Sequence, residues 1–183
     1  MADVLHLMGR VFIKGDIRAV TGLHIGGTDP GINIGGVNTI IADSLTGQPY
    51  IPGSSLKGKM RSLLEKYMAL PLFEHAGVEN MHTADVSSKR NGRNLSEAEA
   101  RAIYQDSRVA QVFGVPAQTF NTPTRLIVRD VQLQPESALE LLDARTELPY
   151  SEIKTEVSID RITSQASPRQ VERVPAGAVF GEM

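Results

Sequence analysis

The chain has 183 residues, of which 41% are hydrophobic and 22% are charged, and its formal net charge is −2. This length and composition predict one soluble globular domain with a core of its own, and no apolar run approaches the ~18 residues of a membrane span. The slightly acidic balance excludes a free-standing, strongly basic DNA-binding domain, so any nucleic-acid contact must gather cations on one surface. Cysteine is absent, which excludes disulfides and thiolate metal sites; with no secretion signal visible, we expect an intracellular location.

The N-terminal region predicts a strand followed by an ordered loop. Apolar and polar side chains alternate from Val11 to Val20, which is the period of a strand. The next stretch, 21–38, holds six glycines interleaved with leucine, isoleucine and valine. A floppy linker would not need those apolar residues, so we expect a loop that lies against another surface. A short strand over 39–42 follows.

The segment 49–61, which reads PYIPGSSLKGKMR, carries the strongest functional signal. It predicts an extended entry and then a helix from near Ser54 to about Met68, whose apolar residues share one stripe. Free backbone N–H groups and the positive end of the helix dipole, beside three cations, favour a bound phosphate. The alternative is a solvated basic face that binds nothing, with Arg61 only pairing with Glu65 four residues on.

A nucleotide-binding loop is a second alternative for the same segment. Gly53, Gly58 and Lys59 match the G-x-x-x-x-G-K spacing, but Met60 stands where a serine or threonine should hold magnesium. Pro49 and Pro52 stand just before this loop, whereas a phosphate-binding loop follows a buried apolar strand. We therefore prefer the backbone of a nucleic acid as the ligand. Gly58 costs roughly 1 kcal/mol relative to alanine in a helix, which close approach of a ligand or backbone would explain.

The middle of the chain gives weaker signals. Residues 74–94 are polar, and we expect them to be irregular and mobile, with His75 and His82 solvated rather than bound to a metal. Ser96 and Glu99 predict a capping box for a helix that ends at Phe113, with Gly114 as its stop.

The last third predicts a strand and a long arm. Apolar residues mark a strand over 125–133, inside which Asp130 has no role that propensity explains. Residues 150–180 alternate in a way that predicts two strands with a polar tip at 164–169. An isolated hairpin is marginal in water, so we expect this arm to pack on a partner.

Taken together, these segments resemble one known family over residues 10–180: the backbone subunit of type III CRISPR interference complexes, in the RAMP superfamily, nearest to its type III-A form. The motifs that carry the resemblance are TGLHIGG at 21–27, IGGV at 34–37, YIPGSSLKGKMR at 50–61, TRLIVRD at 124–130, IDRIT at 159–163 and PRQVERVP at 168–175.

The resemblance implies an α+β fold, a modified RRM-like (ferredoxin-like) RAMP domain over residues 1–183. Its palm would span about 8–70 and 121–135, its fingers insertion about 71–120, and its thumb hairpin about 150–175. Family chains continue past the thumb, whereas this sequence stops at Met183. We therefore expect the C-terminal part to be missing, leaving an exposed sheet edge and poor behaviour as a monomer.

The resemblance also implies partners and site residues. They are CRISPR RNA, single-stranded target RNA, further copies of the chain and other type III subunits, in the cytoplasm of a prokaryote, for antiviral defence. The implied RNA-binding residues are His24, Gly26, Gly27, Ser54, Ser55, Lys57, Lys59, Arg61, Arg129, Arg161, Arg169 and Arg173. His24 could instead only cap the glycine loop.

Asn38 departs from the family pattern. Members that cut target RNA carry an aspartate directly after the Ile-Gly-x-Val/Ile stretch, and an amide neither neutralises magnesium nor accepts a proton well. We expect this chain to bind guide and target but to cut poorly, and Asp29 is too far along the loop to substitute. The alternative is an active endoribonuclease that uses Mg²⁺ or another divalent cation, or one that processes guide precursors with His24 as acid/base. Without cleavage no cofactor is expected.

Overall fold

The computed structural model describes residues 6–27, 37–75, 78–90, 92–115 and 124–181. The chain forms two compact units: unit 1 comprises Met1–Ile51 and Val131–Met183, and unit 2 comprises Pro52–Asp130. Each unit contains helices and antiparallel strands, so the expected mixed α and β composition is confirmed. No helix within the described ranges has the length and apolar character needed to cross a membrane.

Unit 1 is built on a four-stranded sheet in the order β1-β10-β7-β2, with every neighbouring pair antiparallel. Its strands are β1 (Ile17–Arg18), β2 (Tyr50–Ile51), β7 (Val131–Leu133) and β10 (Val179–Gly181). Phe180 lies opposite both Ile17 and Leu133. Residues opposite one another share a face, so these apolar side chains gather on one side, where Phe180 and Leu133 are buried.

Three predicted strands are shorter in the structure than the alternation suggests. The 11–20 strand forms only at Ile17–Arg18, and the 125–133 strand only at Val131–Leu133. Residues 39–42 form only two isolated bridges, Ile40 with Gly26 and Ala42 with Pro49, and no strand. The reason is that β10, between β1 and β7, has three residues, and an alternating segment becomes a strand only where a neighbour supplies hydrogen bonds.

Helix α4 (Pro135–Asp143) covers part of this sheet and was not anticipated. Proline stands at its first position and an acid in its first turn, both of which favour a helix start. Ser137, Ala138 and Leu141 form its buried side. The Ser137 hydroxyl accepts a 3.0 Å hydrogen bond from the Val179 N–H, which fixes the helix to β10.

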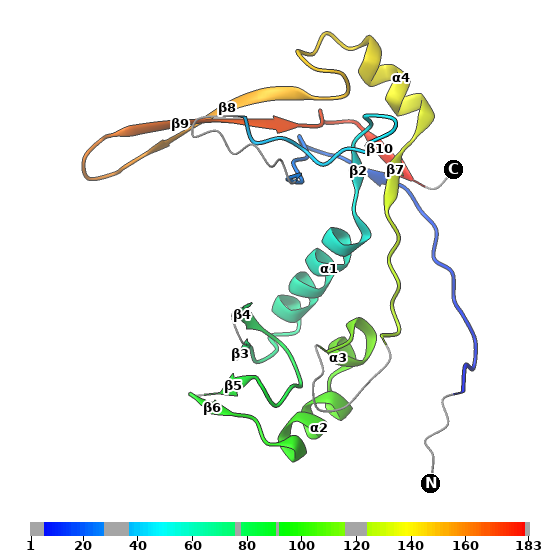
Figure 1. Ribbon diagram of the computed structural model, residues 1–183, viewed down its shortest axis with the longest axis vertical. Coiled ribbons are helices and arrows are strands. Elements are labelled where there is room, and N and C mark those ends of the chain that lie inside the picture. The colour runs from blue at the N-terminus through cyan, green and yellow to red at the C-terminus, as the bar shows by residue number, and fades with distance from the viewer. Residues whose placement is uncertain (1–5, 28–36, 76–77, 91, 116–123, 182–183) are drawn as a thin grey trace. The chain divides into compact units, whose positions relative to one another are not determined.

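The predicted hairpin arm is confirmed, but its tip lies at 160–165 rather than at 164–169, and Val179 and Phe180 belong to β10 of the sheet instead of to the arm. Strand β8 (Glu152–Ile159) pairs with β9 (Ala166–Arg173) in an unbroken antiparallel register from Glu152↔Arg173 to Ile159↔Ala166. Figure 1 shows the arm reaching beyond the sheet of unit 1. All side chains at 157–170 are exposed, so nothing in the described chain buries the outer half of the arm.

Unit 2 contains three helices and a second antiparallel sheet in the order β4-β3-β5-β6. Its elements are α1 (Gly53–Tyr67), β3 (Phe73–His75), β4 (Val78–Met81), β5 (Lys89–Arg90), β6 (Arg93–Asn94), α2 (Glu97–Asp106) and α3 (Arg108–Phe113). Its buried apolar side chains are Phe73, Ala84, Leu95, Ala100, Val109, Ala110 and Phe113.

Two expectations for unit 2 need correction. The described residues of 74–94 are only partly irregular, because they supply parts of all four strands of the second sheet, while residues 82–88 lie outside the strands. The predicted 96–113 helix begins at the expected capping box of Ser96 and ends at Gly114, but it breaks at Ser107. There the serine hydroxyl accepts from the Ala110 N–H and starts α3 as a new helix, a local competition that a helical pattern does not reveal.

Candidate nucleic-acid interface

The start of α1 is shaped by the segment that precedes β7. The Gly53 N–H donates a 2.8 Å hydrogen bond to Asp130 Oδ1. The backbone of Val128 and Arg129 passes so close that a Cβ at position 53 would overlap the Val128 carbonyl oxygen. Asp130 therefore satisfies one free N–H and places a carboxylate at the positive end of the helix. This explains both Gly53 and the charge at position 130 that propensity left unexplained.

The rest of the helix start is open. The side chains of Ser54, Ser55 and Lys59 are exposed, Lys57 is half-buried, and the N-cap residue, Pro52, offers no side-chain hydrogen bond. A Cβ at Gly58 would meet no atom within 4 Å, so no protein group accounts for a glycine there. Besides these residues, Arg129 is exposed in the segment that crosses the helix start. The structure thus brings five of the six predicted contacts of unit 2 to the first turns of α1: Ser54, Ser55, Lys57, Lys59 and Arg129.

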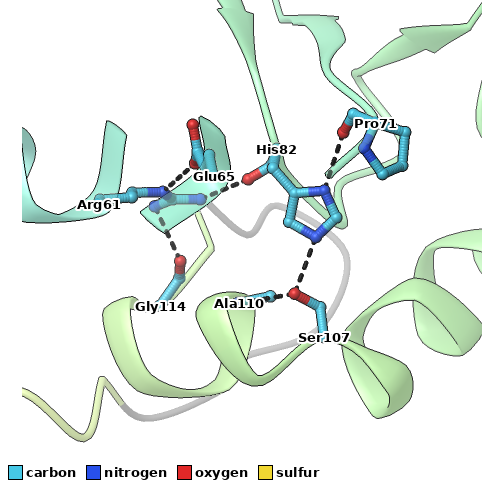
Figure 2. A network of polar contacts seen from close by, with 7 residues as sticks. All are labelled: Arg61, Glu65, Pro71, His82, Ser107, Ala110 and Gly114. Atoms are coloured by element: carbon cyan, nitrogen blue, oxygen red, sulfur yellow. Dashed lines mark hydrogen bonds and ion pairs between the residues drawn. The ribbon is translucent and has the colours of Figure 1, made fainter. Parts of the chain in front are cut away.

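Arg61 has a different environment from the lysines (Figure 2). Its Nε donates to Glu65 Oε1 at 2.9 Å, its Nη1 to the Gly114 carbonyl at 3.0 Å and its Nη2 to the His82 carbonyl at 2.6 Å. The Arg61 and Glu65 side chains are only 14% and 8% exposed. The pairing with Glu65 was one of the alternatives, but the two carbonyl contacts link distant segments and no local spacing could reveal them. We therefore do not propose Arg61 as an RNA contact.

His82 is not solvated, contrary to expectation, but buried beside this ion pair (Figure 2). Its Nδ1 lies 2.8 Å from the Pro71 carbonyl oxygen, which can only accept, so Nδ1 carries the hydrogen. Its Nε2 lies 2.8 Å from Ser107 Oγ, whose hydroxyl can donate to it. Both ring nitrogens are thus satisfied, and His82 ties together three segments of unit 2. The side chain of His75 lies outside the described residues.

In unit 1, the two ends of the glycine-rich loop are held together. The Ile41 N–H donates to the Ile25 carbonyl at 2.8 Å and the Gly27 N–H to the Thr39 carbonyl at 3.1 Å. The span 28–36, which includes Asp29, lies outside the described residues. Gly27 also packs closely on the returning chain, since a Cβ there would lie 3.0 Å from the Ile40 carbonyl oxygen.

Asn38 lies against the arm. Its N–H donates to the Gln170 carbonyl at 3.1 Å, and its carbonyl accepts from the Glu172 N–H at 2.9 Å. Its backbone is therefore pinned to β9, while its side chain is exposed. The residue at which the family pattern has a carboxylate thus sits at the base of the arm, on the surface of unit 1.

Glu172 connects the loop to the arm. Its carbonyl oxygen lies 2.6 Å from His24 Nδ1, and its carboxylate accepts from the Ile40 N–H at 3.0 Å and from the Ser151 hydroxyl at 2.5 Å. Sequence reasoning did not single out Glu172, because its partners lie far from it along the chain. The partial burial of this acid at the base of the arm becomes visible only once β9 is placed.

Two arginines of the arm form pairs across its strands. Arg169 Nη2 lies 2.7 Å from Glu156 Oε2, and the arginine lowers the pKa of the Glu156 carboxyl below its usual range, with Lys154 acting in the same direction. Arg173 Nε lies 2.7 Å from Glu152 Oε1, and both side chains are half-buried. Arg161 is exposed at the tip. The predicted RNA contacts of unit 1 are thus spread from the glycine loop, which holds His24, Gly26 and Gly27, along the arm.

The predicted contacts therefore form two groups, one in each unit, and both units combine helical structure with an antiparallel sheet. The family described as the RAMP superfamily matches residues 16–182, and the chain belongs to that superfamily. Three similar relatives share one name, "CRISPR system Cms endoribonuclease Csm3". This chain is 33% identical to the one from Methanocaldococcus jannaschii, 38% to the one from Methanothermobacter thermautotrophicus and 36% to the one from Streptococcus thermophilus. The resemblance to the type III-A form is thereby confirmed.

The similarity covers most of this chain but not most of each relative. It spans 96%, 92% and 93% of the chain and 62%, 64% and 65% of those three relatives, so the chain corresponds to just under two thirds of their length. A chain in a solved "Csm-crRNA-target RNA ternary complex in type III-A CRISPR-Cas system" overlaps 92% of this chain and 62% of its own length, at 17% identity and a TM-score of 0.41.

Proposed function

We propose that the chain is an RNA-binding backbone subunit of a type III CRISPR effector, which holds CRISPR RNA and target RNA in a prokaryotic cytoplasm. Its partners would be further copies of itself and other subunits of the complex. Membership of the RAMP superfamily and the shared name of the relatives support this proposal. The modified RRM-like palm, the fingers and the thumb arm belong to the same proposal.

The open start of α1 is the observation that carries the proposal. Exposed Ser54 and Ser55 lie in its first turn and Lys57 and Lys59 follow, while the Asp130 carboxylate accepts from the first N–H of the helix, that of Gly53. Backbone N–H groups and lysines bind phosphates without reading bases, which suits a guide RNA of any sequence. Gly58 leaves the backbone of the second turn bare, so a strand of RNA can approach closely there.

Salt-dependent binding tests this assignment. Single-stranded RNA would be titrated with the chain, and with its Lys59→Gln variant, at several salt concentrations. Each lost phosphate contact should lower the slope of log affinity against log salt by about 0.7 and weaken binding to all sequences alike. Lys66→Gln, an exposed cation in the last turn of the same helix, is the matched control. Equal slopes for the two variants would remove Lys59 from the interface.

We further propose that the chain holds target RNA but cuts it poorly. Magnesium-dependent cleavage requires hard oxygen donors, and position 38 offers a neutral amide. Within the described ranges, no group of three or more histidine, aspartate or glutamate side chains could hold a metal ion. The described residues therefore do not fit a metal centre.

Restoring the carboxylate tests this second part. A reconstituted complex containing Asn38→Asp should gain metal-dependent cleavage of target RNA, whereas Asn38→Ala should bind target RNA and stay inactive. If Asn38→Asp and the unmodified chain cut at the same rate, the account of position 38 is wrong.

An active endoribonuclease is the second candidate, because the relatives carry that word in their names. It predicts metal-dependent fragments at even spacing from a complex that contains the unmodified chain.

A further inference from the structure

The His24 ring has a defined orientation and a defined hydrogen position. Its Nδ1 lies 2.6 Å from the Glu172 carbonyl oxygen. A backbone carbonyl only accepts hydrogen bonds, so Nδ1 must carry the hydrogen. In the neutral ring the other nitrogen, Nε2, then has a free lone pair and acts as an acceptor.

The carbonyl that orients the ring is itself held in place. The Glu172 N–H donates to the Asn38 carbonyl at 2.9 Å, and the Glu172 carboxylate accepts from Ile40 and Ser151. These bonds come from two segments, 38–40 and Ser151, which limits movement of the Glu172 backbone. The direction in which His24 presents Nε2 is therefore set by the fold of unit 1.

The Nε2 side of the ring is open. His24 is exposed, and among the described residues no group forms a hydrogen bond with Nε2. The nearest feature is Gly26, where an added Cβ would lie 3.7 Å from Nε2, in van der Waals contact. Glycine at this position leaves that space free for a ligand atom.

An acceptor selects a donor, which narrows the ligand chemistry. Phosphate oxygens of RNA only accept, so they do not complement a neutral Nε2. Base edges differ from one nucleotide to the next, whereas each ribose carries a 2′-hydroxyl that can donate whatever the sequence. We propose that His24 Nε2 accepts a hydrogen bond from a ribose 2′-hydroxyl, so that His24 selects RNA over DNA. The inference rests on the proposed RNA-binding function.

Two substitutions separate the two ring nitrogens. His24→Asn places an amide N–H near the position of Nδ1 and keeps a donor to the Glu172 carbonyl, but it has no atom at the position of Nε2. His24→Gln can place an amide oxygen near that position and restore an acceptor. His6→Asn, at another exposed histidine of unit 1, is the control. Circular dichroism of each variant verifies that it is folded.

The assay compares the affinities of the full chain for fluorescent single strands of one sequence, about 30 nucleotides long. The sugars would be ribose, 2′-deoxyribose and 2′-fluororibose, all compared in one buffer. The 2′-fluoro strand keeps an RNA-like sugar pucker but cannot donate.

The unmodified chain and His6→Asn should prefer ribose over both other sugars by about two- to tenfold, the worth of one hydrogen bond. His24→Asn should lose this preference through weaker RNA binding with unchanged DNA binding, and His24→Gln should recover part of it. If His24→Asn keeps the full preference, or the unmodified chain has none, the inference is overturned while RNA binding stands. If no strand binds at all, the proposed function itself fails.

Discussion

Replacing Arg61 with methionine is the sharpest test of unit 2, because this side chain was expected to face RNA and instead lies inside the protein. The substitution keeps much of the aliphatic length and removes the guanidinium. It leaves the Glu65 carboxylate, only 8% exposed, without its partner at 2.9 Å. It also leaves the Gly114 and His82 carbonyls without the donors at 3.0 and 2.6 Å.

The expected loss in the free energy of unfolding follows from these contacts. Breaking a buried ion pair by removing one partner costs about 3–5 kcal/mol, chiefly because the remaining charge is buried without compensation. The two carbonyl contacts are bonds from a charged donor, worth about 1.5–3 kcal/mol each, but losses within one network do not add fully. We therefore expect a total near the upper end, about 5 kcal/mol. Arg61→Met combined with Glu65→Met should cost less than Arg61→Met alone, because the unpaired charge is removed.

Urea unfolding followed by circular dichroism at the helical band measures the change, since three of the four described helices belong to unit 2. Lys59→Met is the control, because this exposed lysine lies on the same helix and should change stability by less than about 0.5 kcal/mol. RNA binding is compared with a milder variant, Arg61→Lys, which keeps the positive charge. In RNA titrations Lys59→Met should lose more affinity than Arg61→Lys. An Arg61→Met chain as stable as the control, but unable to bind RNA, would refute the structural role assigned to Arg61.

Three further outcomes follow. A hydrogen bond and ion pair with Arg93 at 2.7 Å lower the pKa of the Glu99 carboxyl, so its contribution to stability is present above the unfolded-state value near 4.3 and is lost as pH falls; acid titration of helicity should be flatter for Glu99→Gln. Gly53→Ala should destabilise the chain by about 1–3 kcal/mol in urea unfolding, because its Cβ meets the Val128 carbonyl; an unchanged midpoint would contradict that geometry. Val11, Phe12 and Ile13 form a run of apolar side chains that are 89%, 77% and 90% exposed, so the chain should self-associate with concentration in sedimentation, and Phe12→Ser with Ile13→Ser should do so less; a monodisperse unmodified monomer would count against this.

Local signals predicted the elements whose hydrogen bonds are local. The capping box of Ser96 and Glu99 formed as expected, because its donors and acceptors lie three residues apart. The arm at 152–173 also formed, since a hairpin pairs segments that follow each other. Strands over 11–20 and 125–133 were overestimated because their partners are distant and short. The α4 helix was not predicted because its nine residues are too few for the helical period to stand out.

The candidate site divides in the same way. The sequence shows the cations of 57–61 and the glycines of the loop. It does not show which of these residues face outward. The apolar stripe of α1 would ordinarily mark its buried side, yet Leu63 and Tyr67 are 54% and 88% exposed while Glu65 is buried. Periodicity reports which residues share a face, and only the neighbouring elements decide which face they cover.

The amino-acid sequence by itself determined the family, the cationic start of α1, the hairpin and the amide at position 38, because each depends on residue type or on short spacing. Tertiary structure alone decided that Arg61 is an internal partner, that Asp130 occupies the helix start, and that Glu172 orients His24. Those roles depend on hydrogen bonds between residues as far as 148 positions apart, and no local pattern encodes such contacts.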